Sequence, residues 1–516
     1  MIARLRSKKS TKSLKDDGKD NDKDKVLRKL SPVERLHCAM HFLGIYVGCA
    51  ISCRYHIPEL LLTSDAESLQ RIVENAFARA ILEYPLFTVG RVNADSKKPS
   101  WVQLDQIDFN KHIEWQTVPE PDKYETTLHD VLDRQINEPY TNLETQPSWR
   151  AVILKPADSN FIDVVFAWDH TQGDGKSGKM FLESLFTHLN APGDSKVILR
   201  DRSFEVPNTE ITPPLHHLIK FDLSLNFIVG EVARDIIPKK SKPHMPTWAP
   251  VSAESSRTRQ LITEVAKQPL KRVLDACRQH GTTLTGLMHA LISVSMATRL
   301  PEIKARAFLC ATPVCLRQFQ KPGHPSIDMH KTAINSVAYC PFEFDEEAIA
   351  EIRQHISNVD AKPEGNSNLE ATVWSAAKAI REGLTAKLDQ GAKNNHAGLA
   401  KFVKDWRSYL KDHGKTREYS WEISNLGVVQ GQGNDDNTEK WTIGSAIFTQ
   451  TAPTNGPAFT FSVISVKGGG LVVTNSWQIG TVEEDLALGV SSDVESWLNE
   501  LGSTGCINFG AREMSS

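Results

Sequence analysis

The residues best suited to acid–base chemistry lie in one short segment, from His170 to Gly175. His170 comes directly after an apolar run at 161–168, and Asp174 follows four positions later between two glycines. Because histidine titrates near neutral pH, an unprotonated imidazole can accept a proton from a bound hydroxyl or amine. Asp174 could orient that imidazole, or it could pair with a cation. The spacing indicates a general base; the simpler alternative is that both side chains only cap a helix.

A strand, a tight turn and a helix are expected to position His170. The run 161–168 is apolar apart from Asp163, which is typical of a strand covered on both faces. It should form a hairpin with 151–154, because the residues between them are rich in turn formers. Apolar residues at helical spacing follow at 181–189. A strand end is a rigid mount, and the loop after it would expose His170 to a cleft.

Two capping boxes predict the starts of helices earlier in the chain. The first begins at Ser31, with Pro32 in the first turn and Glu34 completing the box. The second begins at Ser64 and precedes the clearest amphipathic pattern of the sequence, which Pro85 ends.

The segment from His170 to Gly175 matches the HxxxDG motif of the superfamily that contains chloramphenicol acetyltransferase, peptide-synthetase condensation domains and plant BAHD acyltransferases. Within that superfamily the chain most resembles the fungal alcohol acetyltransferase family. Further matching segments include an SNLG element at Ser424–Gly427, and they extend the resemblance from about residue 31 to the C-terminus.

The resemblance implies an α/β (α+β) fold of two chloramphenicol-acetyltransferase-like lobes, each a mixed sheet flanked by helices, with a tunnel between them. Acetyl-CoA, as co-substrate, would enter from one end and a small-molecule alcohol or amine from the other, with His170 at the middle. The acceptor would attack the thioester directly, without a covalent acyl-enzyme and without a metal. Asp174 would be structural and would pair with an arginine of the other lobe, best matched by Arg317.

The SNLG element is expected to reach the tunnel. Ser424 and Asn425 are short donors that could stabilise an oxyanion, or they could simply close a turn before Gly427. Gly175, Ser424 and Asn425 are therefore the expected substrate-binding residues.

The composition divides the chain into four parts. Residues 1–30 are rich in Lys, Asp and Ser and predict a disordered tail. An N-terminal lobe with the HxxxDG motif is expected at 31–205, and a C-terminal lobe with the SNLG motif at 251–516. Prolines at 206–250 indicate a crossover linker between them. Its amphipathic stretch at 215–237 is expected to pack across the lobes, with a lipid surface as the alternative.

The bulk composition is that of a globular protein and argues against several functions. The net charge of −3 gives no general attraction to nucleic acid. The eight cysteines form no CxxC pair, so a reducing, cytoplasmic location is expected. No apolar run is long enough to span a bilayer. Peripheral contact with the endoplasmic reticulum or lipid droplets stays open, and we expect a monomer.

Several short motifs fail on inspection. The segment 173–180 nearly spells a phosphate-binding P-loop, but Met180 stands where a hydroxyl must hold magnesium. A serine-hydrolase elbow fails because Lys179 replaces its last glycine. His289 is expected to be a core or surface histidine, and His216 and His217 lack an evident third metal ligand.

Three other functions compete with alcohol O-acetylation. An N-acetyltransferase acting on an amine or secondary metabolite would use the same machinery. A non-catalytic lobe pair would bind a ligand without turnover, although His170 and Asp174 are intact. A stand-alone condensation domain usually has a second histidine before the catalytic one, and this chain has Asp169 there.

Overall fold

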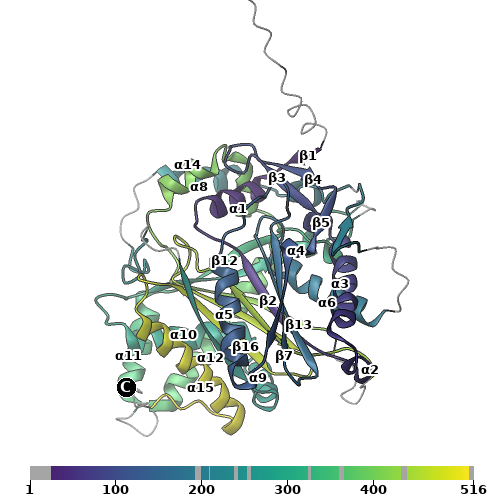
Figure 1. Cartoon of the computed structure of the whole chain (residues 1–516). Coiled ribbons are helices and arrows are strands. Elements are labelled where there is room, and N and C mark those ends of the chain that lie inside the picture. Colours follow the sequence, from purple (N-terminus) through teal and green to yellow (C-terminus); the bar gives the residue numbers. More distant parts are fainter. Residues whose placement is uncertain are drawn as a thin grey trace, which may run out of the picture.

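Two β-sheets with helices packed against them make up most of the molecule (Figure 1). The computed structural model describes residues 25–191, 199–208, 210–236, 242–252, 257–322, 327–359, 365–431 and 439–510. Each sheet contains both parallel and antiparallel neighbours. The predicted mixed α/β class, with sheets flanked by helices, is confirmed.

The first sheet carries the HxxxDG segment. Its strands, in spatial order, are β14 (Thr442–Gln450), β2 (Cys49–His56), β8 (Phe161–Trp168), β7 (Trp149–Pro156) and β6 (Ile113–Val118). The helices of this lobe are α1 (Pro32–Phe42), α3 (Ala66–Leu82), α5 (Tyr124–Asn137) and α6 (Gly175–Asn190). The predicted hairpin is present as β7 and β8, and β8 is central and buried along nearly its whole length.

The second sheet is built from the C-terminal half. Its strands, in spatial order, are β10 (Thr258–Val265), β16 (Leu471–Gln478), β15 (Phe459–Val466), β13 (Trp421–Val429), β11 (Phe308–Cys315) and β12 (Val337–Phe344). Its helices are α9 (Lys267–Gln279), α10 (Leu284–Arg299), α11 (Glu346–Asn358), α12 (Gly365–Asp389) and α15 (Glu484–Thr504). In Figure 1, α10, α11, α12 and α15 gather on one side of the molecule, and α3 and α6 on the other.

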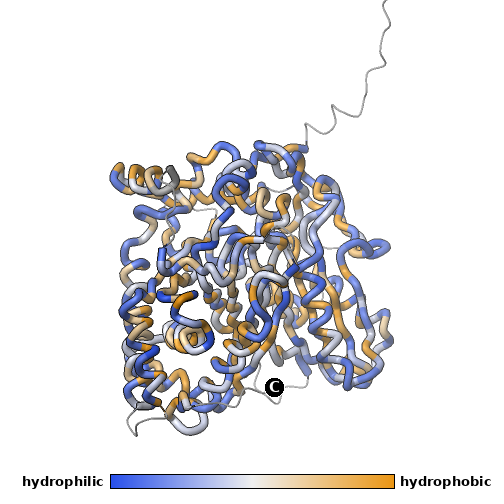
Figure 2. The backbone as a smooth tube through the Cα atoms, turned by 90° about the vertical axis from the view of Figure 1, so that its left-hand side faces the viewer, coloured by the Kyte–Doolittle hydropathy of each residue, from blue (hydrophilic) through white to orange (hydrophobic). Residues whose placement is uncertain are grey.

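Strand alternation gives the second sheet two different faces. Odd-numbered residues such as Trp421, Ile423 and Phe461 belong to the core shared with the helices. Even-numbered residues point the other way, toward β14 and the first lobe, because successive side chains of a strand alternate. We call these residues the polar face: Ser420, Glu422, Ser424, Thr460, Ser462, Thr474 and Ser476. In Figure 2, hydrophobic segments run through the interior of both lobes.

One strand crosses the expected boundary between the lobes. β14 lies within 251–516, yet it pairs with β2 of the first sheet, from Thr442 opposite His56 to Gln450 opposite Cys49. It also runs against β15 and β16 of the second sheet. Residues 251–516 therefore complete the N-terminal lobe as well as forming their own.

The disordered tail predicted at residues 1–30 ends earlier than residue 30. Residues 1–24 lie outside the described residues, but β1 (Val26–Lys29) pairs with β4 (Ser100–Gln103), which in turn pairs with β3 (Val89–Val92). A second small ladder joins β5 (Gln106–Asp108) to β9 (Ser203–Glu205). Pairing in a sheet satisfies the backbone of residues that looked unstructured by composition alone.

The first predicted capping box is confirmed and the second is wrong by one residue. Ser31 and Glu34 exchange hydrogen bonds with each other's backbone at the start of α1. At the start of α3, Asp65 is the cap, because its carboxylate accepts from the Ser68 amide at 2.7 Å and from the Ser68 hydroxyl at 2.9 Å. A carboxylate accepts both bonds at once, so the helix begins one position later than predicted.

The crossover segment divides into a packed part and an exposed part. Residues 237–241 lie outside the description. The packed part is α7 (Leu215–Leu218) with its C-cap Ile219. It buries Leu215, Leu218 and Ile219 against the second lobe, as predicted. α8 (Leu225–Ile236) instead leaves Leu225 and Val229 exposed. Within the described ranges, no helix combines the length and apolarity needed to cross a membrane.

The remaining helices are short. They are α2 (Glu59–Leu62), α4 (Phe109–His112), α13 (His396–Leu399) and α14 (Trp406–His413).

Candidate active site

His170 occupies the first position of a turn between β8 and α6, two residues beyond the end of the strand. Hydrogen bonds anchor this turn on both sides: the Asp169 amide donates to the Ser148 carbonyl at 2.9 Å, and Gln172 Nε2 donates to the Leu86 carbonyl at 2.7 Å. The Trp168 indole closes the loop by donating to the Gly173 carbonyl at 3.0 Å. The backbone around His170 is thus fixed, while the His170 side chain stays partly accessible.

Three side chains from distant segments surround the His170 ring. His37 of α1 stacks on it, with the ring centroids 4.4 Å apart and the planes 12° from parallel. Tyr46 presents its edge at 5.5 Å. Asn335, which precedes β12 in the second lobe, places Nδ2 2.8 Å from His170 Nδ1 and 2.9 Å from the His170 carbonyl oxygen. The ring therefore lies where the two lobes meet.

The surroundings favour the neutral form of His170. Burial is the main cause of a pKa below the usual 6.5, and the nearby Asp174 carboxylate opposes that change. The pKa of His37 falls well below the same value, because burial and the adjacent His170 both disfavour a second positive charge. A neutral imidazole at pH 7 can serve as a base.

Asp174 turns away from His170 and joins the two lobes. Its carboxylate caps α6 by accepting from the Ser177 amide at 3.0 Å. Arg317 Nη1 lies 2.6 Å from its Oδ2, and the Ser336 amide donates to the same oxygen at 3.0 Å. Burial alone would raise the pKa of Asp174, but Arg317 lowers it, so the carboxylate is charged. The ion pair that the resemblance implies is present, with both side chains buried.

Gly175 brings the HxxxDG segment against the SNLG element. A Cβ at this position would lie 2.8 Å from Leu426 Cδ2 and 3.3 Å from Phe448 Cζ. The absence of a side chain therefore permits close packing between α6, β13 and β14. This contact gives Gly175 a packing role in the structure; the resemblance had placed it among the substrate-binding residues.

The two expected oxyanion donors lie on opposite faces of β13. Ser424 belongs to the polar face and is partly accessible. Asn425 is exposed on the other side, where its amide donates to Thr285 Oγ1 at 3.2 Å and its Oδ1 accepts from the Gly427 amide at 2.8 Å. Asn425 thus closes the turn before Gly427, which was the simpler of the two expectations, and it is not directed toward His170.

Asp169 explains the departure from the condensation-domain pattern. Its carboxylate lies 2.6 Å from Arg91 Nη2, and both side chains are buried. Burial alone would raise the pKa of Asp169, yet Arg91 lowers it to about 2. Asp169 also accepts from the Thr171 amide at 2.9 Å. It is a charged residue that holds the turn, in the position where a condensation domain has its extra histidine.

The other histidines noted in the sequence are not joined to this site. His289 is buried in the second lobe, where Nε2 lies 2.8 Å from Thr312 Oγ1 and Nδ1 accepts from the Trp421 indole at 2.9 Å. It is a core histidine with both ring nitrogens occupied, as expected. His216 and His217 lie side by side. Among the described residues, no group of three His, Cys, Asp or Glu side chains could hold a metal ion.

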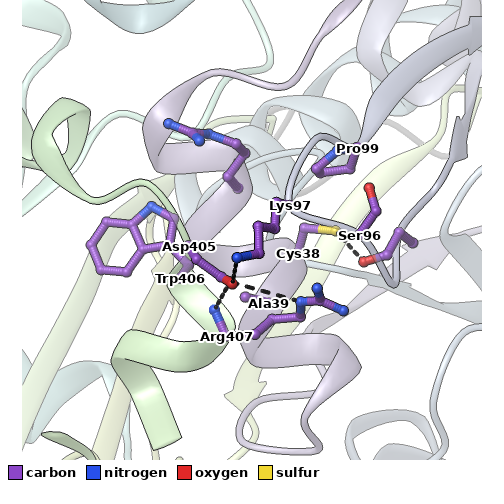
Figure 3. Close-up of a pocket in the computed structure, with 10 residues that line it drawn as sticks. Cys38, Ala39, Ser96, Lys97, Pro99, Asp405, Trp406 and Arg407 are labelled. Carbon is purple, nitrogen blue, oxygen red and sulfur yellow. Dashed lines mark hydrogen bonds and ion pairs between the residues drawn. The ribbon is translucent and has the colours of Figure 1, made fainter. Parts of the chain in front are cut away.

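Two pockets flank α1, the helix that carries His37. One lies between α1, the loop 94–99 and α14 (Figure 3). There Asp405 pairs with Lys97 at 3.0 Å and lies 4.0 Å from Arg407, and Arg35 also lines the pocket. The other pocket, which we call the basic pocket, lies at the start of α1. Its lining contains Lys220, Lys321 and Lys401 and no carboxylate.

Sequence reasoning did not single out His37, Tyr46 or Asn335 as site residues. Each comes from a segment remote from His170, and none stands in a recognisable motif. Asn335 shares the odd-numbered positions of the strand that follows it. Because many residues do so, this local pattern does not single it out.

Comparisons with known proteins identify the family of this chain. Residues 103–487 match the family described as "Alcohol acetyltransferase". "Probable alcohol acetyltransferase FCK4" of Fusarium pseudograminearum is 28% identical over 507 residues, covering 94% of this chain and 97% of that protein. "Probable alcohol acetyltransferase crmB" of Aspergillus fumigatus is 23% identical, covering 88% and 95%.

Solved structures share the fold. The TRI3 trichothecene 15-O-acetyltransferase of Fusarium sporotrichioides superposes with a TM-score of 0.67 at 13% identity, covering 92% of this chain and 94% of that one. The condensation domain of the MokA polyketide synthase gives a TM-score of 0.55 at 11% identity, covering 94% and 99%. Since the family match spans most of the chain, this protein belongs to the alcohol acetyltransferase family and is an acyltransferase.

Proposed function

We propose that this protein transfers the acetyl group of acetyl-CoA to the hydroxyl of a small-molecule alcohol, with His170 as the general base. The observation that carries the proposal is the His170 ring itself. It is partly accessible, it lies at the meeting of the two lobes, and its pKa is below the usual 6.5. A base with these properties is ready to accept a proton at neutral pH.

The reaction would proceed in one bound complex. His170 takes the proton of the acceptor hydroxyl as the oxygen attacks the thioester carbonyl carbon. The tetrahedral intermediate then breaks its carbon–sulfur bond, and His170 returns the proton to the departing sulfur. The products are an acetate ester and free CoA thiol, and the enzyme ends in the protonation state in which it began.

Asn335 would hold the His170 ring in place. Its Nδ2 lies 2.8 Å from His170 Nδ1 and donates to the His170 carbonyl oxygen at 2.9 Å. For Nε2 to accept the substrate proton, the hydrogen of the neutral ring must be on Nδ1. The bond between the His170 ring and its own backbone, which raises the pKa of His170, supports that tautomer.

Ser424 is the better placed of the two expected oxyanion donors. It lies on the polar face, which points toward the first lobe and His170, whereas the Asn425 amide is bonded to Thr285. Loss of one oxyanion donor typically lowers kcat by about 10²–10³. Ser424→Ala should therefore lower kcat far more than Asn425→Ala.

The basic pocket is proposed to hold the phosphate groups of acetyl-CoA. Lys220, Lys321 and Lys401 supply positive charge around a cavity whose lining has no carboxylate, and Lys220 also pairs with Asp222 outside that lining at 3.0 Å. Lysine ammonium groups bind phosphate as point charges. Lys321→Ala should raise the KM for acetyl-CoA and weaken its dependence on salt, while kcat changes little. An unchanged KM in Lys321→Ala and Lys401→Ala would place the phosphates elsewhere.

Release of free CoA thiol from acetyl-CoA, in the presence of candidate acceptors, tests the proposed function. Removal of the base should slow turnover by roughly 10²–10⁴-fold, so His170→Ala should be nearly inactive. His129→Ala is the matched control, because His129 is exposed on α5, remote from the turn that carries His170. Undiminished turnover in His170→Ala would reject the assignment, and product mass would distinguish an ester from the amide of an N-acetyltransferase.

A further inference from the structure

The polar face contains a buried carboxylate that the reaction described above does not use. Glu422 lies on β13 and is 3% exposed. Its Oε2 has no hydrogen-bond partner among the described residues. A buried carboxylate oxygen without a partner is costly, because desolvation is not offset by a hydrogen bond. An arrangement of this kind is typical of a site that a ligand completes.

Neighbouring strands surround Glu422 with further hydroxyl groups. The sheet register places Thr460 of β15 beside Glu422, and Ser476 of β16 beside Thr460. The hydroxyls of Ser420, Thr474 and Ser476 are buried, and they too have no partner among the described residues. A wall of unpaired hydroxyls and one carboxylate cannot be an ordinary apolar core, since buried polar groups are normally hydrogen-bonded.

Tyr339 lies beside this carboxylate on the same face of the sheet. On β11, Ala311 pairs with Glu422 on one side and with Pro341 of β12 on the other. Tyr339 is two residues from Pro341, so its side chain projects from the same face of the sheet. The Tyr339 side chain is 49% exposed. Glu422 is the largest single cause of its raised pKa, followed by burial and by a hydrogen bond between the two side chains. Tyr339 is therefore close to Glu422 and reachable from solvent at the same time.

The same face leads back to His170. Asn335, which contacts His170, is four residues before Tyr339 on one continuous segment, a distance of about 13 Å in an extended strand. Tyr46, whose ring is 5.5 Å from His170, is close enough to Glu422 and Tyr339 for both to raise its pKa. His170, Asn335, Tyr339 and Glu422 thus border one region between the lobes.

The charge of this region indicates which substrate it serves. No lysine or arginine belongs to the polar face, and a buried carboxylate repels phosphate groups. The phosphate-bearing end of acetyl-CoA is therefore disfavoured here, in contrast to the basic pocket. Burial raises the pKa of Glu422 to about 7, so at neutral pH the group is divided between the carboxylate and the carboxylic acid, and either form can accept a hydrogen bond from a ligand.

From these observations we infer that the polar face is the acceptor subsite. The acceptor carries a second hydrogen-bond donor, a hydroxyl or an amine. This group donates a hydrogen bond to Glu422 while another hydroxyl of the acceptor is acetylated at His170. This inference rests on the proposed function and narrows it. The acceptor class is then a polyfunctional alcohol, and a simple apolar alcohol becomes a poor substrate because it would leave Glu422 Oε2 unpaired.

Paired probes test the inference directly. We would compare octanol with a series of octanediols in which the second hydroxyl is placed progressively further from the first, using kcat/KM from thiol release. A hydrogen bond to a charged group corresponds to a preference of roughly 10- to 100-fold, so the best diol should exceed octanol by that factor. Glu422→Gln should reduce the preference.

Two further variants keep the test informative if Glu422→Gln folds poorly. Tyr339→Phe removes a hydroxyl beside Glu422 from a partly exposed position, and it should also reduce the preference. Glu114→Gln, an exposed carboxylate on β6 paired with Arg134, is the matched control and should leave the preference intact. Calorimetric titration of His170→Ala with the same probes measures binding without turnover and should show the same order.

The possible outcomes separate the two proposals. Turnover that survives in His170→Ala would overturn the proposed function. Loss of turnover in His170→Ala, together with equal use of octanol and every diol, would overturn the acceptor inference alone. A diol preference that persists in both Glu422→Gln and Tyr339→Phe, or no binding and no turnover of any diol, would overturn it as well.

Discussion

Arg317 Nη1 lies 2.6 Å from Asp174 Oδ2, although 143 positions separate the two residues and each belongs to a different lobe. The same carboxylate accepts from the Ser336 amide, next to Asn335. The ion pair thus fixes the start of β12 beside His170. Its contribution is positional, because neither charged group reaches the His170 ring.

Replacement of Arg317 should destabilise the protein strongly. Arg317→Met leaves the buried Asp174 carboxylate without its partner, and such a change typically costs about 3–5 kcal/mol. The thermal unfolding midpoint measures the effect. Arg134→Met is the matched control, because the Arg134–Glu114 pair is exposed and worth about 0–1 kcal/mol.

The double variant Arg317→Met with Asp174→Asn should recover part of the lost midpoint, since it removes the unpaired charge. Equal midpoints for Arg317→Met and Arg134→Met would contradict the structural role of the pair.

The acid limb of the pH–rate profile should fall below pH 6.5. Burial is the first cause that lowers the pKa of His170, so the neutral base survives at a pH where a solvated histidine is already half protonated. Activity is then present above the folded-state pKa and is lost as the pH falls through it. The measurement is kcat/KM against pH, which reports the free enzyme. An acid limb above pH 7 would be incompatible with this environment.

Asn335→Ala should lower kcat by about fivefold while the thermal midpoint changes little. The residue supplies one hydrogen bond to His170 Nδ1, and a bond of about 1 kcal/mol corresponds to that factor in rate. Asn335→Asp separates orientation from packing. A carboxylate beside Nδ1 favours the imidazolium, so the acid limb should move to higher pH. An unshifted limb in Asn335→Asp would show that Asn335 does not set the state of His170.

Gly178→Ala should disturb the mount of His170. A Cβ on Gly178 would overlap the Trp168 ring, which lies between the end of β8 and α6. Overpacking of this kind costs about 1–3 kcal/mol, or more where the neighbour cannot move. Both the thermal midpoint and kcat should fall.

Gly230→Ala is the contrasting change, because nothing lies within 4 Å of a Cβ at that position on α8. Alanine favours a helix over glycine by about 1 kcal/mol, so Gly230→Ala should stabilise α8 slightly. Equal thermal midpoints and equal kcat for Gly178→Ala and Gly230→Ala would contradict close packing at Gly178.

The part of the site that the sequence predicts is the part that is local. His170 and Asp174 share one turn, so a strand, two glycines and a helix place them without knowledge of the tertiary fold. Arg317 could be assigned through the family resemblance, because its partner was already fixed. His37 and Asn335 could not, since only the packing of α1 and β12 brings them to the ring.

Strand alternation explains the error over Asn425. The sequence treats Ser424 and Asn425 as neighbours with one role, whereas a strand directs them to opposite faces. Trp421 and Ile423 face the helices, and Asn425 continues their side of β13. Likewise, the pairing of β14 with β2 has no local signature, because either sheet would accept a strand with its pattern.

The exchanged strand β14 also determines how the protein can be divided. Neither fragment would be a self-sufficient folding unit. A fragment that ends before Thr442 exposes the unpaired edge of β2, and the remaining fragment carries β14 without its partner strand. Open edges of this kind promote aggregation. The two fragments should therefore regain activity only when refolded together. Wide separation of the two lobes during turnover would have to break the backbone hydrogen bonds between β14 and β2. A substrate would therefore have to enter without wide separation of the two lobes.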